Sequence, residues 1–467
     1  MDKELIKLID EKIEEATKDI INDTVKLVNI NSERGDAIPG APFGKGAREV
    51  LDTVLEMGKE EGFAVKDYNV GVVSTALKDG KADLGIWAHG DVVPAGEGWD
   101  YEPYNATVID DKYIIGRGVT DNKGQLAAIF NLLKIIKKLG IKLNYNPALF
   151  VGSAEETGMH DLKGMEGNSD AKGFINVCTP PRLSLVPDGG FPIGYGAMGS
   201  ATVYMKSKTP LHGFTFTAGK KETPGIAEAV FDNINFDGKL EGCTITKGEK
   251  TTVSAFTAPI HSASADGKGN MITVLSSALM ESGKIADEDL YILEFFKKLT
   301  TDVRGEMFGI DVESKLMGKC VVAPLSVTCD EGYPEICVRI RYPIELTFDE
   351  MIEKIKESCE KLGFIAKGEI RHKPYLYDNT SEVVKKLSDI ANEVTGENGV
   401  PYVNGSTYAH YLPNAYIYGM SGNVAPPQVK SGRGGAHSID ESVSLDRLKR
   451  AMRIYARALL MLNETKW

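Results

Sequence analysis

The sequence predicts an α/β protein with a long α+β insertion, and three observations lead to that expectation. With 467 residues the chain is too long for one hydrophobic core and has the usual length of two or three domains. From Glu4 to about Asp188, helical stretches alternate with short apolar runs, which is the rhythm of a sheet covered by helices. A β-rich texture follows, and the α/β texture then resumes. We therefore expect residues 1–190 and 378–467 to form one domain and residues 191–377 to form an inserted one.

The elements of the first domain follow from their patterns in order. Residues 1–30 carry charges every few positions and no uninterrupted apolar region, so they predict an amphipathic helix and not a signal peptide. Residues 46–63 predict the next helix. The apolar runs at residues 84–88 and 148–154 predict short buried strands.

The insertion has a different pattern. Residues 201–207 and 335–344 predict strands, and residues 348–364 predict a helix, which together indicate an α+β domain. Beyond the insertion, residues 381–396 and 444–462 have helical patterns. We expect these last helices to pack with the first domain.

The composition excludes several classes of partner. The net charge of −12 argues against binding to a nucleic-acid backbone, which requires a basic face. No apolar run is long enough to cross a membrane. The six cysteines include no CxxC pair and are sparse for this length, so we interpret them as reduced, mostly buried thiols and expect a cytoplasmic protein.

A polar triplet, His89-Gly90-Asp91, directly follows the predicted strand at residues 84–88. In open α/β sheets ligands bind at the carboxyl ends of the strands. Residues two apart in extended chain point to the same side, so Asp91 can hydrogen-bond the imidazole of His89 and fix the nitrogen that it presents. Taken alone, such a triplet is more often an ordinary strand-end histidine than a functional one.

Further acidic or histidine positions occur in the same context, at the end of an apolar run and beside glycine. They are Asp121, the adjacent pair Glu155 and Glu156, Asp188, and His437. Each has an alternative interpretation: Asp121 is also suited to capping a helix, and Asp188 to a turn. Because the side chains of adjacent residues leave the backbone in different directions, one glutamate can bind a metal while the other faces the substrate.

These positions together supply two imidazoles and three carboxylates, which suits two divalent ions. If Asp121 bridges the ions, one takes His89 and Asp188 and the other takes Glu156 and His437. Each ion then has three protein ligands and the open position that catalysis requires. Zinc fits this mixture of nitrogen and oxygen ligands best, although cobalt and manganese also fit.

Five segments resemble the successive motifs of the co-catalytic zinc peptidases, a family that includes aminoacylase, carnosinase, glutamate carboxypeptidase and PepV-type dipeptidases. The segments are AHGDVVPAGEGW, GRGVTDNKG, AEETG, VPDGGFP and GGAHSIDE, and their order fits along nearly the whole chain. The resemblance implies a three-layer catalytic domain with an inserted lid, and two zinc ions held by His89, Asp121, Glu156, Asp188 and His437. It also implies that Asp91 orients His89, that Glu155 is the general base, and that a cis peptide bond follows Asp121.

The same resemblance assigns residues that bind the substrate. The lid segment IHSASADGKGNM implies that His261 stabilises the oxyanion, and RIRYP implies that Arg341 binds the substrate carboxylate. The segment NGSTYAH resembles the substrate loop, with Gly405, Ser406 and Thr407; here Ser406 replaces a glycine and His410 a long basic side chain. The insertion has the length of the PepV-type lid, so we expect a monomer whose lid closes its own site. Three other histidines match no motif, and we interpret them as structural or surface residues: His160, His212 and His372.

The expected reaction is hydrolysis of a dipeptide, a small-molecule substrate, with no nucleic-acid or membrane partner. Glu155 would take a proton from the attacking water and pass it to the leaving nitrogen. One alternative is an N-acyl amino acid deacylase of the same family. A second is a metal-binding protein without turnover, which is disfavoured because it would need neither Asp91 nor Glu155.

Overall fold

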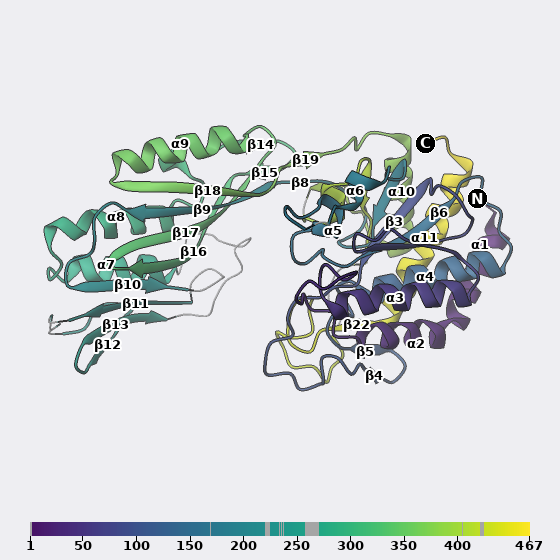
Figure 1. Ribbon diagram of the computed structural model, residues 1–467, viewed down its shortest axis with the longest axis horizontal. Helices are drawn as coiled ribbons and strands as arrows, with labels where there is room; N and C mark the ends of the chain where they lie inside the picture. The colour runs from purple at the N-terminus through teal and green to yellow at the C-terminus, as the bar shows by residue number, and fades with distance from the viewer. Residues whose placement is uncertain are drawn as a thin grey trace. The chain divides into compact units, whose positions relative to one another are not determined.

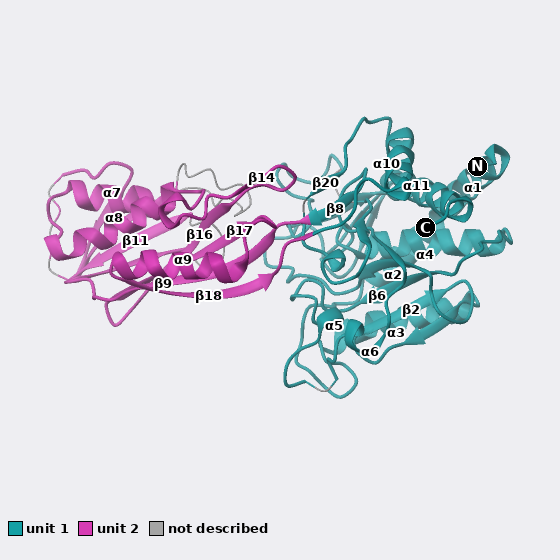
Figure 2. Cartoon of the chain, turned by 90° about the horizontal axis from the view of Figure 1, so that it is seen from above, with its two compact units in different colours: residues 1–196, 376–467 teal, residues 197–375 magenta. Residues whose placement is uncertain are grey.

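The computed structural model describes residues 2–168, 170–219, 225–232, 234, 236, 238–256, 270–403, 405–420 and 425–467. The chain divides into two compact units, which are Met1–Gly196 with Leu376–Trp467, and Ala197–Tyr375 (Figure 2). We call them unit 1 and unit 2. Unit 2 is inserted into unit 1 along the chain, so the predicted class, an α/β domain with a long α+β insertion, is confirmed.

Unit 1 is built on a mixed sheet with the order β1-β2-β6-β3-β7-β21-β8-β19, in which β20 pairs with β8. Its strands are β1 Ala64–Asp67, β2 Val72–Ala76, β3 Leu84–His89, β6 Pro147–Gly152, β7 Leu183–Val186, β8 Gly194–Ala197, β19 Tyr375–Leu376, β20 Tyr402–Val403 and β21 Ala415–Ile417. The central strands β6, β3, β7 and β21 are parallel, and every residue in them is buried. Parallel strands covered on both faces require such continuous apolar runs. Their carboxyl ends therefore meet at one edge of the sheet.

Helices cover one face of this sheet. They are α1 Lys3–Glu15, α2 Thr17–Val28, α3 Lys45–Glu60, α4 Lys123–Lys138, α10 Glu382–Thr395 and α11 Leu445–Glu464. Helix α3 packs on β1, β2 and β6, and α4 packs on β3 and β6 with α2 and α11 beside it (Figure 1). The N-terminal segment forms two helices where one was expected, because the chain leaves helical geometry at Ala16, whose ψ is 5°.

An aromatic cluster covers the opposite face. The Trp87 ring of β3 stacks on Phe150 with centroids 4.2 Å apart, and Phe174 of α6 (Phe174–Val177) meets it edge-on at 5.0 Å. Tyr408, in a short 3-10 helix (Tyr408–His410), closes the cluster. Two neighbouring residues of one strand thus pack on different faces, since Ile86 belongs to the core under the helices.

Unit 2 has its own sheet and its own core. The strand order is β12-β13-β11-β10-β16-β17-β9-β18, and all its pairs are antiparallel. The strands are β9 Gly199–Ser207, β10 Phe214–Ala218, β11 Ile226–Phe231, β12 Thr244–Lys247, β13 Thr251–Phe256, β16 Val321–Asp330, β17 Tyr333–Tyr342 and β18 Phe364–His372; the helices are α7 Met271–Glu281, α8 Asp287–Thr301 and α9 Phe348–Lys361. The helices pack with the even-numbered residues of β17 in one core. The odd-numbered side chains of β17 therefore lie on the other face.

Smaller elements complete the two units. In unit 1, β4 (Thr107–Ile109), β5 (Tyr113–Ile115) and β22 (Ser442–Ser444) form a three-stranded sheet, and α5 spans His160–Lys163. In unit 2, β14 (Glu313–Ser314) pairs with β15 (Gly318–Lys319), and a 3-10 turn spans Glu306–Phe308. All six cysteines are free thiols, but the expectation that most are buried is wrong, because only Cys320 and Cys359 are buried and the other four are partly exposed. Among the described residues, no helix has the length and apolarity needed to span a membrane.

Candidate metal centre

Strand ends and helix starts in unit 1 carry the predicted metal ligands. His89 is the last residue of β3, Asp188 follows β7 by two residues, and Glu156 follows β6 by four. Asp121 lies two residues before α4, and His437 lies in the loop that leads to β22. The peptide bond between Asp121 and Asn122 is cis, as the resemblance implied.

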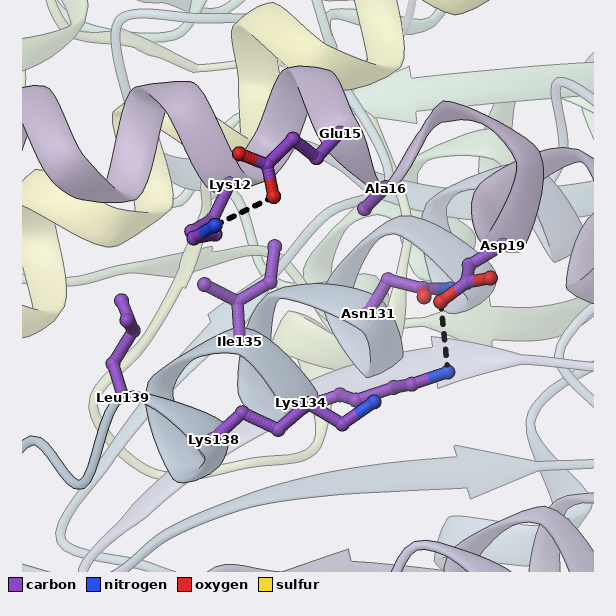
Figure 3. A pocket seen from close by; sticks show the side chains of 9 residues that line it. All are labelled: Lys12, Glu15, Ala16, Asp19, Asn131, Lys134, Ile135, Lys138 and Leu139. Carbon is purple, nitrogen blue, oxygen red and sulfur yellow. Dashed lines mark hydrogen bonds and ion pairs between the residues drawn. The ribbon is translucent and has the colours of Figure 1, made fainter.

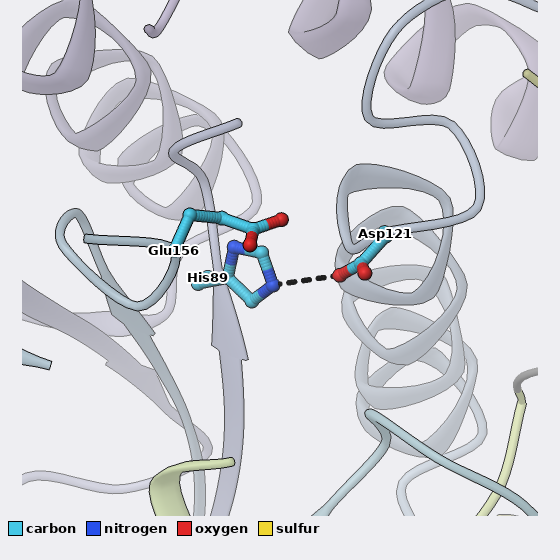
Figure 4. Close-up of side chains that lie close together, drawn as sticks. All are labelled: His89, Asp121 and Glu156. Atoms are coloured by element: carbon cyan, nitrogen blue, oxygen red, sulfur yellow. Dashed lines mark hydrogen bonds and ion pairs between the residues drawn. The ribbon is translucent and has the colours of Figure 1, made fainter. Parts of the chain in front are cut away.

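The structure brings the five residues together around Asp121. Its Oδ1 lies 2.9 Å from His89 Nε2 (Figure 4). Its Oδ2 lies 3.2 Å from His437 Nε2. His89 Nε2 also lies 3.9 Å from an oxygen of Asp188, and His437 Nε2 lies 2.9 Å from Glu156 Oε1. One carboxylate thus faces two histidines, and each histidine has a further carboxylate beside it.

The electrostatics of this cluster favour positive charge. Burial opposes the charged form of His89, but hydrogen bonds with Asp121 and Asp91 raise its pKa well above the ordinary value. Hydrogen bonds with Asp121 and Glu156 raise the pKa of His437 to about 10. Burial raises the pKa of Asp188 to about 8, and the negative charge of Asp121 acts in the same direction. Carboxylates crowded in this way require cations next to them.

The residues present fit divalent metal ions. Two groups have ligand atoms that all lie within 4.8 Å of one another: His89 with Asp121 and Glu156, and His89 with Glu155 and Asp188. Imidazole nitrogens and carboxylate oxygens without a thiolate are a donor set that suits zinc. The second group includes Glu155, which the sequence analysis expected to act as a base.

Glu155 is placed as a proton-transfer group would be. Only 8% of its surface is exposed, and its Oε1 has no hydrogen-bond partner. Burial raises the pKa of this carboxyl well above its usual range, and the negative charges of Asp188 and Glu156 act in the same direction. A carboxyl group whose proton affinity is raised in this way is suited to accept a proton and to pass it on.

Asp91 has a role that the sequence did not reveal. Its carboxylate accepts hydrogen bonds from the main-chain N–H groups of Glu155, at 3.1 Å, and Glu156, at 3.0 Å. His89 Nδ1 donates to the main-chain oxygen of Asp91 at 3.0 Å, whereas the carboxylate lies 3.5 Å away. The main-chain oxygen and the carboxylate of Asp91 thus both lie beside His89 Nδ1, which leaves Nε2 facing Asp121, and the carboxylate also holds the glutamate pair.

Glu441 is a residue to which sequence reasoning assigned no role. It is fully buried, and its carboxylate accepts the main-chain N–H groups of Thr120 at 2.8 Å and Asp121 at 3.0 Å. It also accepts from Gly118 N at 3.1 Å and from Arg117 Nη1 at 2.6 Å. Glu441 therefore fixes the turn that carries Asp121. Its place in the GGAHSIDE segment was the only signal in the sequence.

The predicted substrate loop is tied to the glutamate loop by one buried carboxylate. Asp161 accepts the main-chain N–H groups of Ser153, at 2.7 Å, and Ala154, at 3.0 Å, and the hydroxyl of Tyr408, at 2.5 Å. Tyr408 directly follows Thr407 of the predicted loop. A displacement of one loop is therefore transmitted to the other.

The other predicted substrate residues lie in both units. In unit 1, Gly405 has a φ of +81°, a value that favours glycine, and Thr407 Oγ1 accepts the main-chain N–H of Ala409 at 3.3 Å. Ser406 Oγ lies 3.4 Å from a ring nitrogen of His410. In unit 2, Arg341 lies on β17. His261 lies outside the described residues.

We expect Tyr408→Phe to destabilise the protein and to weaken substrate binding, because it removes a hydroxyl that Asp161 accepts in a buried site. A hydrogen bond to a charged group contributes about 1.5–3 kcal/mol to the free energy of unfolding. KM should rise more than kcat falls. The control is Tyr411→Phe in the same loop, whose hydroxyl is 3.5 Å from Lys163 Nζ. Equal effects of the two changes in denaturation and steady-state kinetics would contradict the role of Asp161.

A pocket elsewhere in unit 1 contains none of these residues. It has a volume of about 410 Å³ and is lined by residues of α1, α2 and α4 together with Ala16 and Leu139 (Figure 3). Its charged side chains are paired: Lys12 meets Glu15 at 2.6 Å, Lys134 meets Asp19 at 3.2 Å, and Lys138 meets Glu61, outside the lining, at 3.6 Å. Because these charges are already neutralised, the acidic cluster around Asp121 is the stronger candidate for chemistry.

Comparison with known proteins identifies the family. The model of peptidase family M20/M25/M40 matches residues 85–461, which is most of the chain. The protein is therefore a metallopeptidase and belongs to peptidase family M20/M25/M40. The resemblance found in the sequence is confirmed.

Relatives cover nearly the whole chain. A "putative dipeptidase" of Staphylococcus haemolyticus is 26% identical over 97% of this chain and 98% of its own length. The "putative dipeptidase" YtjP of Bacillus subtilis is 25% identical over 95% of this chain and 96% of its own length. Human carnosine dipeptidase 1 has a similar fold, with a TM-score of 0.60 at 15% identity over 99% of both chains. The yeast di-peptidase Dug1p, from Saccharomyces cerevisiae, has a TM-score of 0.58 at 14% identity over 99% of both chains.

Proposed function

We propose that this metallopeptidase hydrolyses dipeptides with the aid of two divalent metal ions, of which zinc is the preferred one. The observation that carries the proposal is the arrangement of Asp121, whose two oxygens face two different histidines while a buried glutamate, Glu155, has an unpartnered oxygen nearby. The names of the full-length relatives support dipeptides as the substrate class.

Five residues would hold the ions. His89 and Asp188 would bind one, Glu156 and His437 the other, and Asp121 both. When bound, the ions lower the pKa of water and withdraw charge from the substrate carbonyl. Cobalt and manganese suit the same donors.

The chain's own residues move the proton. Glu155 takes a proton from the attacking water and delivers it to the leaving nitrogen, and its burial keeps that proton from bulk solvent. Asp91 acts through the main chain, because it holds the N–H groups of both glutamates and so fixes where the Glu155 carboxylate lies. His261 stabilises the developing oxyanion in this proposal.

Unit 2 acts as the lid in this proposal. Arg341 binds the substrate carboxylate, and Gly405, Ser406 and Thr407 contact the substrate backbone. The lid serves the site of its own chain, and the enzyme works as a monomer in the cytoplasm.

The experiment is a hydrolysis screen with protein reconstituted with zinc, cobalt or manganese. It uses free dipeptides and N-acyl amino acids that carry the same C-terminal residues. We expect dipeptides to be cleaved, chelation to stop the reaction, and added metal to restore it. Cleavage of the N-acyl compounds alone would favour the deacylase alternative. Bound metal without any hydrolysis would favour a binding protein.

We expect the specific activity to be independent of protein concentration, because the insertion is long enough to close the site of its own chain. Activity is measured across a dilution series, and the oligomeric state is measured at each point by light scattering. The proposal fails if activity falls as a dimer dissociates.

A further inference from the structure

Three arginines lie close together on the face of the unit 2 sheet that carries none of the described helices. Arg339 and Arg341 are alternate residues of β17, so both point away from the core that holds Ile340. Arg371 lies on β18, where the register shifts between residues 370 and 372. The positive charges of Arg371 and Arg341 both act on the guanidinium group of Arg339.

These arginines have no carboxylate partner among the residues that the structure describes. Glu369 is on the same cross-strand row as Arg339, with Thr202 between them, but it pairs with Lys367 at 2.9 Å. The Nε of Arg339 is buried without a hydrogen-bond partner. Burial, followed by the positive charges of Arg371 and Arg341, lowers the pKa of Arg339 to about 10.

Such a cluster needs an external anion. The chain has 66 acidic residues against 54 lysines and arginines, so three neighbouring arginines without a described carboxylate partner are not a consequence of composition. Guanidinium groups bind carboxylates in a planar, two-pronged geometry, which makes such a cluster suited to a ligand with more than one carboxylate.

Building on the proposed function, in which Arg341 binds the α-carboxylate of the substrate, we propose that Arg339 and Arg371 bind a second carboxylate on the same residue. Alternate residues of one strand are ~7 Å apart along the chain, a separation that long arginine side chains can span to reach two groups of one amino acid. The second carboxylate is the side chain of a C-terminal aspartate or glutamate. The enzyme therefore selects dipeptides with an acidic C-terminal residue.

The test compares isosteric substrates on the zinc-loaded enzyme. We expect kcat/KM for Ala-Glu to exceed that for Ala-Gln by about tenfold or more, mostly through KM, because a hydrogen bond to a charged group is worth that much. Glu-Ala and Gln-Ala should be cleaved with similar efficiency, since their side chains are on the other residue. Arg339→Gln and Arg371→Gln should each reduce the preference for Ala-Glu, and Arg339→Lys should retain part of it.

Lys206→Gln is the matched control. Lys206 is an exposed cation on β9, on the same face of the sheet, and its ammonium lies over the ring of Tyr333 at 5.7 Å. Its removal changes the net charge equally but should leave the ratio of Ala-Glu to Ala-Gln unchanged.

Two results would overturn the inference while leaving the proposed function intact. One is equal hydrolysis of Ala-Glu and Ala-Gln by the unmodified enzyme. The other is an Arg339→Gln variant, folded by circular dichroism, that keeps the preference or shows the same loss as Lys206→Gln. If no dipeptide of any kind is cleaved in the presence of metal, both the proposed function and this inference are wrong.

Discussion

Glu155→Gln should lower kcat by about a hundredfold to ten-thousandfold, with KM little changed, while both metal sites stay filled. The change removes the group that takes and delivers the proton, and general acid–base groups contribute rate factors of about that size. It keeps the size of the side chain, and Glu155 is not among the five residues proposed as metal ligands. Rates measured beside metal content by elemental analysis test both halves of the expectation.

Glu156→Gln is the matched comparison, because the two glutamates are adjacent and chemically identical. Glu156 Oε1 lies 2.9 Å from His437 Nε2, in the group that surrounds Asp121. We expect this variant to lose metal from one site and to recover part of its activity with added zinc. If Glu155→Gln loses metal while Glu156→Gln keeps it, the two roles are reversed. If neither change slows hydrolysis, the proposed site is wrong.

Local patterns predicted most of the elements of the fold. The helix expected at residues 46–63 is α3, Lys45–Glu60, and the one expected at residues 444–462 is α11, Leu445–Glu464. Both segments have strong apolar periodicity, which is the most reliable signal for a helix in a sequence. The break at Ala16 was missed because both sides of it have the same amphipathic pattern.

The candidate ligands were also accessible from the sequence, because each lies within three residues of a glycine and most follow an apolar run. The contacts that hold these ligands in place could not be predicted from the sequence. Asp91 reaches the main chain of Glu155 because β3 and β6 are adjacent parallel strands with His89 opposite Gly152. That register joins segments about sixty residues apart, and no local pattern specifies it. The same limit applies to Glu441, which holds the turn of Asp121 across 320 positions of sequence.

The supporting contacts lead to a second large effect, at Asp91. We expect Asp91→Asn to lower kcat by about tenfold to a hundredfold, which is the usual range for residues that support a metal site. The carboxylate accepts the N–H groups of both Glu155 and Glu156, whereas an asparagine has one acceptor oxygen and turns an N–H₂ group toward the second donor. One buried N–H then loses its partner, and the glutamate pair shifts.

The metal content of the Asp91→Asn variant decides how Asp91 acts. Because His89 Nδ1 donates to the main-chain oxygen of residue 91, the substitution leaves the orientation of the imidazole intact, and both ions should remain bound. Asp302→Asn is the control, since this carboxylate also accepts several main-chain N–H groups, at Gly305 and Met307, but lies in unit 2. It should lower stability without a comparable loss of kcat. If Asp91→Asn loses metal in proportion to activity, Asp91 acts through the proposed ligands His89 or Glu156, and its bond to Glu155 does not set the rate.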